Sequence, residues 1–441
     1  MSVLRLKPDV SAWRALAALS AGYFCVLLDQ GLMPVITPQL PFDVGDAVWL
    51  TSVYLLCTVV PMPIAGRLGD AYGQRRIFLT GLALYIAALA LAAVSWSHAV
   101  LIAARAVQGI GSSLFLPQAF GVVNRVFAPE TRGRAFAAWG VVGSIASLIG
   151  PVVGGLLVDG AGWRAAFGVQ AAVALAAFAL AAFWVPVLPT MEGSLDTASV
   201  MLTLIGLGSL IYGIQYGQWW AIAAGCIGVG LLIWRGTTGR DQGFLPLRLL
   251  SHGNFAVGIF GVTVMGFAAA SMFIPMMYWL QTVAEVTSTR AGLLTAPMSV
   301  FALVLTPVAG VAADRLHPKL LCVGGFLAMT AALAIGYGVM VTGASPLWFA
   351  VVTGLLGAGS AFIWAPNAAT TMRAVPDEHA GAASGMYNTV RQVGSVLGVA
   401  LVGAALTRGD ISDSAAAGLL VPLIAVALGA GCSLLLRRDL S

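Results

Sequence analysis

Charged side chains are scarce in this chain: Asp, Glu, Lys and Arg together make up 9% of its 441 residues. A soluble globular domain carries about 25%, so these residues cannot cover the surface of a water-soluble protein of this length. Hydrophobic residues account for 59%, and the mean hydropathy is +0.94. The composition excludes a soluble enzyme, a disordered chain and a nucleic-acid-binding protein.

Several signals of catalysis are also missing. The chain has two lysines, and neither stands in the Gly-Lys-Ser/Thr of a phosphate-binding loop. Neither G-x-S-x-G nor H-E-x-x-H occurs, and the four histidines are far apart in sequence. The five cysteines fall in apolar segments, which argues against a disulfide framework. We therefore expect no enzyme activity, no cofactor and no metal site.

Long apolar segments are what the chain has in abundance. A transmembrane helix needs about 20 mostly apolar residues. The sequence predicts an all-α integral membrane protein with fourteen such segments: 15–37, 47–66, 77–96, 99–121, 135–157, 164–186, 198–218, 219–235, 255–278, 291–313, 319–342, 345–370, 381–405 and 415–436.

The basic residues predict the orientation of these segments. With the N-terminus inside, 17 of the 22 Lys and Arg residues fall in cytoplasmic segments, and three fall outside. Cytoplasmic loops of membrane proteins carry such an excess. The pattern predicts that both termini are cytoplasmic, and it explains the net charge of +5 without nucleic acid.

The two ends of the chain resemble each other. The pattern of residues 107–112 recurs at 355–360, and several glycines and Arg125 recur at the same offset of 248. This predicts a six-helix half over 1–186, a two-helix insertion over 187–254 and a second half over 255–441. Parallel halves of this kind suit a transporter with its site between them.

Three motifs carry a family resemblance. Between the second and third segments the chain reads GRLGDAYGQRR over residues 66–76. This resembles the G-x-L-x-D-x-x-G-R-R/K loop of the major facilitator superfamily. The second motif is Arg105 to Gly109 in the fourth segment. The third is GPVVGG in the fifth segment, which resembles the antiporter motif of that superfamily through Gly150, Pro151, Gly154 and Gly155.

Fourteen segments make the chain most similar to the fourteen-helix drug:H+ antiporter branch. Leu28-Asp29 in the first segment and Asn388…Arg391-Gln392 in the thirteenth also fit this branch. One position departs from its pattern, because Gly31 stands where the branch usually has threonine. The resemblance implies a major facilitator fold that works by alternating access.

The resemblance also implies a conformational role for the loop motif: Gly66, Asp70, Gly73, Arg75, Arg76 and, in the second half, Asp314. Asp70 is expected to pair with Arg75 or Arg76, and to face the positive N-terminal end of the thirteenth helix, latching the two halves. Asp314 is expected to act in the same way against the fifth helix. The alternative is that both acids are ordinary solvated loop charges.

Charges inside the membrane are costly and therefore informative. Asp29 is the one acidic residue well inside a predicted segment, and Arg105 lies at a similar depth. These two residues are the expected proton-coupling site, and a purely structural ion pair is the alternative. Arg391 shares a helical face with Asn388 and Gln392. Its side chain is expected either to line the cavity or to form hydrogen bonds with another helix.

The substrate cavity is predicted from polar and adaptable side chains in the spans. Methionine suits promiscuous binding, although a methionine stripe is more often packing or lipid-facing. The expected cavity residues are Gln30, Gln108, Met265, Met272, Asn388, Arg391 and Gln392.

Taken together, these features predict a proton-coupled secondary transporter of the cytoplasmic (inner) membrane that exports small amphipathic compounds, as multidrug transporters do. Its partners are a small-molecule substrate, protons and the lipid bilayer, and it is expected to act as a monomer. A dedicated exporter of one endogenous metabolite is the main alternative. An uptake symporter is a weaker one, and a membrane-embedded enzyme or sensor is disfavoured by the missing catalytic motifs.

Overall fold

A computed structural model of the chain describes residues 11–190, 197–238, 253–373, 375 and 380–436. Helices run through almost all of these ranges, and no strand occurs in them. In chain order the α-helices are α1 Ser11–Ile36, α2 Val44–Val59, α3 Met62–Tyr72, α4 Gln74–Ala93, α5 His98–Val126, α6 Pro129–Ala161, α7 Trp163–Trp184, α8 Thr197–Tyr216, α9 Trp219–Thr238, α10 Gly253–Ser271, α11 Phe273–Tyr278, α12 Ser288–Arg315, α13 Pro318–Thr342, α14 Trp348–Arg373, α15 Ala380–Leu406 and α16 Ile411–Ser433. A 3-10 turn, Thr37–Gln39, follows α1, and a π-helical turn, Trp279–Val283, follows α11.

Twelve of the predicted apolar segments each coincide with one helix, and the other two are each divided near a proline. The second segment divides into α2 and α3 at Val60 and Pro61. The ninth divides into α10 and α11, and the π-helical turn follows it. Pro275 lies four residues after Ser271, where α10 ends. A proline ring clashes with the carbonyl group four residues earlier, so the break falls where this clash would otherwise occur.

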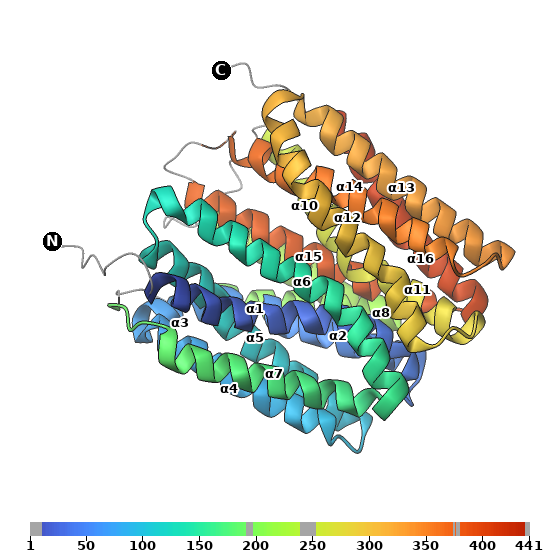
Figure 1. Cartoon of the computed structure of the whole chain (residues 1–441), viewed down its shortest axis with the longest axis horizontal. Coiled ribbons are helices and arrows are strands. Elements are labelled where there is room, and N and C mark those ends of the chain that lie inside the picture. The colour runs from blue at the N-terminus through green and yellow to red at the C-terminus, as the bar shows by residue number, and fades with distance from the viewer. Residues whose placement is uncertain (1–10, 191–196, 239–252, 374, 376–379, 437–441) are drawn as a thin grey trace. The chain divides into compact units, whose positions relative to one another are not determined.

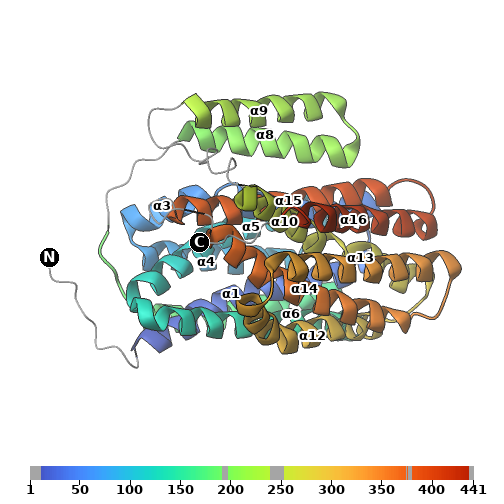
Figure 2. The same cartoon turned by 90° about the horizontal axis from the view of Figure 1, so that it is seen from above.

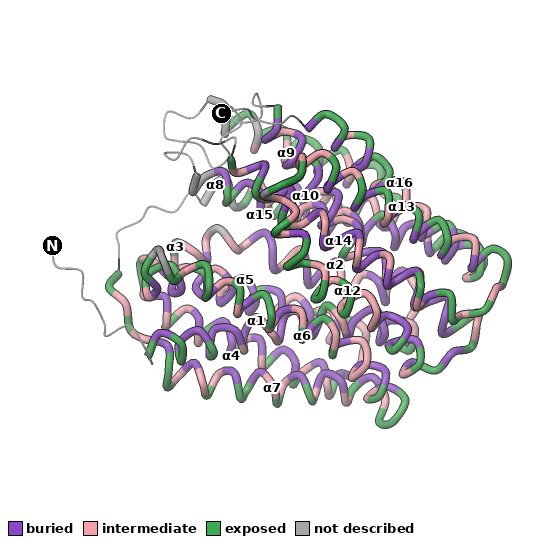
Figure 3. Tube along the Cα trace, turned by 45° about the horizontal axis from the view of Figure 1, so that its top comes forward, coloured by how far each residue is buried: buried purple, intermediate pink, exposed green. Residues whose placement is uncertain are grey.

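Eleven helical stretches among the described residues are long and apolar enough to cross a membrane, and the bent α2–α3 pair makes a twelfth. The helices α8 and α9 contribute shorter apolar stretches, Met201–Tyr216 and Trp219–Leu232. Exposed residues recur along the helices of both units (Figure 3), and among them are large apolar residues such as Leu175 and Phe183 of α7 and Val304 of α12. Such a surface suits contact with lipid, so the chain is a multi-pass helical membrane protein.

The chain forms two compact units, which are described separately. Unit 1 comprises residues 1–33 and 53–200, and unit 2 comprises residues 34–52 and 201–441. In unit 1, α4 packs against α5 and α7 (Figure 1). A Cβ atom at Gly81 of α4 would lie 2.7 Å from the carbonyl oxygen of Gly111 in α5. Small residues therefore bring these two helices into close contact, as is common within membranes.

In unit 2, α14 packs against α12 and α13, and α10 packs against α15. The helices α8 and α9 form a hairpin. Glycines lie where the two helices approach each other most closely, because a Cβ atom at Gly228 of α9 would lie 2.7 Å from the Cα of Gly206 of α8. Figure 2 shows this hairpin alongside α15 and α16. It is held to the start of α2 by Gln215, which accepts a hydrogen bond from Ser52 Oγ at 2.8 Å and donates one to the Gly45 carbonyl at 3.1 Å.

Candidate functional site

A buried ion pair joins α1 to α5 in unit 1. The guanidinium of Arg105 donates to both carboxylate oxygens of Asp29, at 2.8 Å to Oδ1 and 3.1 Å to Oδ2. Both side chains are essentially inaccessible to solvent. A two-pronged arginine–carboxylate contact is among the strongest polar interactions in proteins, and it fixes both side chains in orientation. The structure thus brings together the two residues that the sequence singled out.

Gln108 completes this pair from the next turn of α5. Its Nε2 donates to Asp29 Oδ1 at 3.1 Å, and its Oε1 accepts from Arg105 at 2.7 Å. Gln108 is fully buried, so in this conformation it belongs to the Asp29–Arg105 cluster. The carboxylate therefore has three hydrogen bonds, which offset the cost of placing its charge within the membrane.

Tyr54 of α2 closes the other side of the cluster. The Arg105 guanidinium carbon lies 4.4 Å from the centre of the Tyr54 ring, a cation–π distance. One turn further along α2, Thr58 Oγ1 is 2.9 Å from Ser112 Oγ of α5. The cluster is therefore continuous with a buried polar row between α2 and α5, which was not predicted from the sequence. Helical spacing was the available signal, because Arg105, Gln108 and Ser112 share one face at i, i+3 and i+7.

The glycine-proline motif of α6 packs directly on the segment of α1 that carries Asp29. A Cβ atom at Gly150 would lie 3.0 Å from the Cα of Gly31 and 3.1 Å from the carbonyl oxygen of Leu28. One turn later, a Cβ atom at Gly154 would lie 2.7 Å from Leu32 Cδ2. Glycine is needed at these positions because the two backbones approach so closely. A shift of α6 would therefore displace the backbone of α1 next to Asp29.

The loop motif is organised around Asp70 at the end of α3. Asp70 Oδ1 accepts from the Arg125 guanidinium of α5 at 3.0 Å, and both side chains are partly exposed. This corrects the predicted partner, since the ion pair forms with Arg125 and not with Arg75 or Arg76. Arg125 also donates to the Pro189 carbonyl at 3.0 Å. Arg125 is placed to reach Asp70 because the last turn of α5 ends beside α3.

The other residues of the loop motif occupy different structural positions. Gly73 joins α3 to α4 with φ of 96°, a backbone conformation that favours glycine. Arg75 donates to the Ala182 carbonyl, which ties α4 to the end of α7. A Cβ atom at Gly66 would lie 4.0 Å from the Cβ of Pro117, which is an ordinary van der Waals contact. Arg76 is exposed, and the side chain of Asp314 lies outside the described residues.

The remaining predicted cavity residues belong to both units. Gln30 is exposed on α1, and Asn388 is exposed on α15, where Arg391 and Gln392 are half-buried. Met265 and Met272 are buried in unit 2. Ser395 of α15 donates to the Gly266 carbonyl at 3.1 Å, so α15 packs against α10 beside Met265.

A second polar cluster was not anticipated from the sequence. Gln281 lies in the π-helical turn of unit 2 and is almost completely buried. Its Nε2 donates to the Val35 carbonyl at 3.0 Å, and its Oε1 accepts from Gln39 at 2.8 Å and Ser288 at 3.1 Å. Gln281 thereby donates to a carbonyl in the last turn of α1, where helix carbonyls have no partner within the helix. The π-helical turn, a feature often found at functional sites, is not readable from the sequence.

The sequence model of the Major Facilitator Superfamily matches residues 19–399. This chain belongs to the major facilitator superfamily. The transporter Rv1250 of Mycobacterium tuberculosis, an MFS-type transporter, is 37% identical over 411 residues, covering 90% of this chain and 70% of the relative. The members of this family are transporters, and the relative from M. tuberculosis is named as one. This chain is therefore a major facilitator transporter.

Two further relatives carry more specific names. The tetracenomycin C resistance and export protein of Streptomyces glaucescens is 29% identical and covers 90% of this chain and 77% of the relative. The multidrug resistance protein Stp of M. tuberculosis is 29% identical and covers 89% and 75%. Among solved structures, a POT family transporter in complex with 5-aminolevulinic acid matches with a TM-score of 0.72, at 13% identity over 94% of this chain and 95% of that one. This last likeness concerns the fold alone.

Proposed function

We propose that this major facilitator transporter exports small amphipathic compounds in exchange for protons, within the drug:H+ antiporter branch. The observation that carries the proposal is the buried Asp29–Arg105 pair. Among the described residues, Asp29 is the only acidic side chain that is buried. A group that couples proton movement to transport must be titratable and must have an environment that changes between states.

Protonation of Asp29 would change the net charge and the hydrogen bonds of the whole cluster. A neutral carboxylic acid loses its ionic attraction to Arg105, and one of its oxygens becomes a donor. Arg105 would then keep Gln108 Oε1 and the Tyr54 ring as partners. Because α1 packs on α6 through Gly31 and Gly150, a rearrangement around Asp29 would reach the glycine-proline motif. The charged and neutral forms would thus favour different conformations.

Export, rather than uptake, is favoured by two observations. The glycine-proline motif resembles the antiporter motif of exporters. The relatives Stp and the tetracenomycin C protein are named for drug resistance or export. We extend that direction of transport to this chain and assign the exposed Gln30 and Asn388 and the half-buried Arg391 and Gln392 to substrate contact. Met265 and Met272 would contribute only in a conformation that uncovers them.

The proposed topology has fourteen transmembrane helices. It counts α2–α3 as one span, α10–α11 as one span, and α8 and α9 as two further spans. Both termini would lie in the cytoplasm, and the spans would form two six-helix halves with α8 and α9 as the insertion. The transporter would act as a monomer in the inner membrane.

A dedicated exporter of one endogenous compound is the second candidate. Two relatives from Streptomyces favour it, since one is named for tetracenomycin C export and another as a probable actinorhodin transporter. A panel of chemically unrelated amphipathic compounds distinguishes the two. A multidrug exporter would move several of them, and a dedicated exporter would move one.

The test of proton coupling is substrate flux in proteoliposomes with an imposed pH gradient. The Asp29→Asn variant should no longer concentrate substrate against its gradient, while downhill exchange persists. Asp29→Glu should retain part of the activity. Asp413→Asn is the matched control, because Asp413 is an exposed acid in the first turn of α16. If Asp29→Asn still drives uphill transport, Asp29 is not the coupling site.

A further inference from the structure

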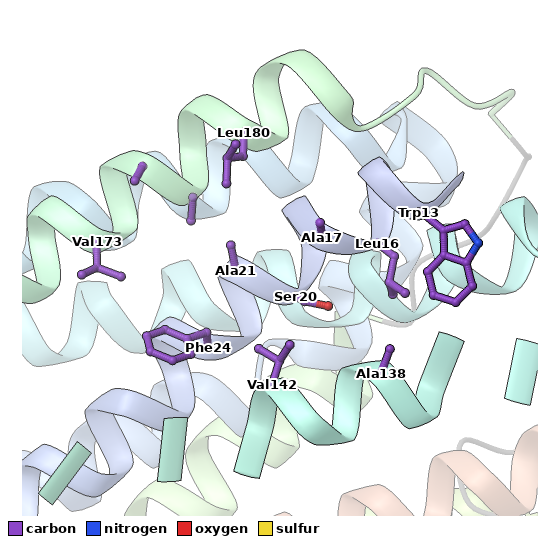
Figure 4. Close-up of a pocket in the computed structure, with 12 residues that line it drawn as sticks. Trp13, Leu16, Ala17, Ser20, Ala21, Phe24, Ala138, Val142, Val173 and Leu180 are labelled. Atoms are coloured by element: carbon purple, nitrogen blue, oxygen red, sulfur yellow. The ribbon is translucent and has the colours of Figure 1, made fainter. Parts of the chain in front are cut away.

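An apolar groove opens on the surface of unit 1 between α1, α6 and α7 (Figure 4). Its volume is about 480 Å³. The walls are formed by side chains such as Leu16, Phe24, Val142, Val173 and Leu180, and Ser20 is the one polar residue among those that line it. All of these residues belong to unit 1. The Asp29 cluster lies further along α1, so this groove is a separate feature.

The groove lies beside a close contact between α6 and α1, which extends to Trp139 and Tyr23, whose ring centroids are 5.3 Å apart. At Gly150 and Gly154, α6 is in backbone contact with α1. Two turns earlier along α6 the approach is still close, since a Cβ atom at Gly143 would lie 3.0 Å from Leu27 Cδ1. Closer to the start of α6, the groove lies between Val142 or Ala138 and the facing residues of α1. The helix α7 packs mainly on α4 and does not fill the space.

The length of the groove matches one leaflet of a bilayer. From Trp13 to Phe24, eleven residues along α1 correspond to about 16 Å at the helical rise of 1.5 Å. One leaflet supplies half of a hydrocarbon core of about 30 Å. An empty apolar groove would forfeit dispersion contacts along its whole length. A single acyl chain, lying along α1, has the shape and the polarity to fill it.

Two arginines stand next to lining residues at the Trp13 end of the groove, where we expect a lipid head group. Arg14 precedes the lining residues Ala17 and Ala21 on one face of α1, and Arg134 precedes Ala138 by one turn of α6. Helical side chains point toward the N-terminus, which directs both arginines away from the apolar part. Both residues are exposed, and neither has a hydrogen bond or ion pair within the described part of the chain. Trp13 is also half-exposed there, as aromatic side chains often are at the membrane interface.

We propose that the α1–α6–α7 groove binds an anionic phospholipid, with one acyl chain along Leu16–Phe24 and the phosphate near Arg14 and Arg134. In the proposed orientation this lipid belongs to the inner leaflet. Binding itself does not depend on that orientation or on proton coupling, because either leaflet of a reconstituted membrane supplies the same head group. The bound chain would fill the space that α1, α6 and α7 leave between them.

The experiment is native mass spectrometry of the full-length protein, in detergent, with phosphatidylglycerol or phosphatidylcholine added at equal concentrations. The wild type should retain one phosphatidylglycerol in preference to phosphatidylcholine. The Arg14→Gln/Arg134→Gln double variant should lose this preference by about tenfold, since each surface arginine attracts anionic lipid. Arg290→Gln is the charge control, because Arg290 is exposed in the first turn of α12, in the other unit.

The acyl-chain part of the proposal has its own variant. Ala138→Phe places a ring in the groove and should abolish retention of the bound lipid. Ala137→Phe is the matched control, since Ala137 is the exposed neighbour on α6 and does not line the groove. Equal retention of both lipids by the wild type, or unchanged retention in Ala138→Phe, would overturn the proposal. Displacement of the lipid by an uncharged amphipathic compound, with no effect of the arginine substitutions, would instead make the groove a site for apolar solutes.

Discussion

Gly31 of α1 lies against Pro151 of α6, so closely that a Cβ atom at Gly31 would be 2.9 Å from Pro151 Cδ. The same atom would be 3.1 Å from the Cα of Gly150. Gly31 is the position at which the sequence departs from the threonine usual in the drug:H+ antiporter branch. The departure has a local reason in this chain, because α1 and α6 meet there without room for a side chain.

The first prediction concerns this contact. Gly31→Thr should destabilise the protein by about 1–3 kcal/mol, the usual cost of overpacking a close contact. It should also impair transport, since the displaced helix carries Asp29. The measurement is thermal unfolding in detergent together with flux in proteoliposomes. Gly140→Thr is the control on α6, because a Cβ atom there has open space around it. Equal unfolding temperatures for the two variants would contradict the close contact.

The second prediction concerns the coupling between Asp29 and Arg105. Arg105→Met leaves a buried carboxylate without its cation, which typically costs about 3–5 kcal/mol. Adding Asp29→Asn removes the unpaired charge and should restore much of the lost stability. The measurement is a double-mutant cycle of unfolding free energies. Additive effects of the two substitutions would mean that the pair contributes no interaction energy.

Transport should respond differently from stability in this cycle. The double variant should be more stable than Arg105→Met, yet it should remain unable to concentrate substrate, because neither residue can then carry or tune a proton. Arg105→Lys should also be impaired, because a single ammonium cannot reproduce the two-pronged contact with Asp29. Uphill transport by the double variant would contradict the proposed role of the cluster.

Much of the helical architecture could be predicted from the sequence, for a physical reason. A helix that crosses a membrane must satisfy its own backbone and present apolar side chains over about 20 residues. Both constraints can be recognised from local sequence, so every predicted segment is largely helical in the structure. The Asp29–Arg105 pair was predictable in the same way, because a buried charge needs a partner at its own depth.

Contacts that depend on how helices approach one another could not be predicted. The choice of Arg125 as the partner of Asp70 depends on where α5 ends relative to α3. Gln108 looked like a cavity residue because its polarity was visible and its burial was not. The cluster around Gln281 depends on a π-helical turn, and the sequence carries no periodic signal for one extra residue in a helix.

The third prediction concerns Asp70 and Arg125. Because both side chains are partly exposed, at 37% and 26%, either Asp70→Asn or Arg125→Gln should change the unfolding free energy by less than about 1 kcal/mol. Transport should nevertheless fall, since this pair joins α3 to α5 and, through Pro189, to the segment after α7. The charge-swapped double variant, Asp70→Arg with Arg125→Asp, should recover part of the flux. No recovery, with unchanged flux in both single variants, would leave Asp70 as an ordinary solvated charge.

The last prediction concerns Gln281, which binds the end of α1 within unit 2. Gln281→Leu keeps the approximate size of the side chain and removes its hydrogen bonds to the Val35 carbonyl and to Gln39. Leaving such buried groups unsatisfied costs about 1–3 kcal/mol. The backbone around residues 35–40 should then exchange its amide hydrogens faster, which hydrogen-exchange mass spectrometry measures directly, and the unfolding temperature should fall. Gln218→Leu is the control, because Gln218 is only partly buried and its side-chain hydrogen bonds within the described residues are to its near neighbours Tyr216 and Trp220. If the two variants show the same exchange at residues 35–40, the Gln281 cluster does not hold the end of α1.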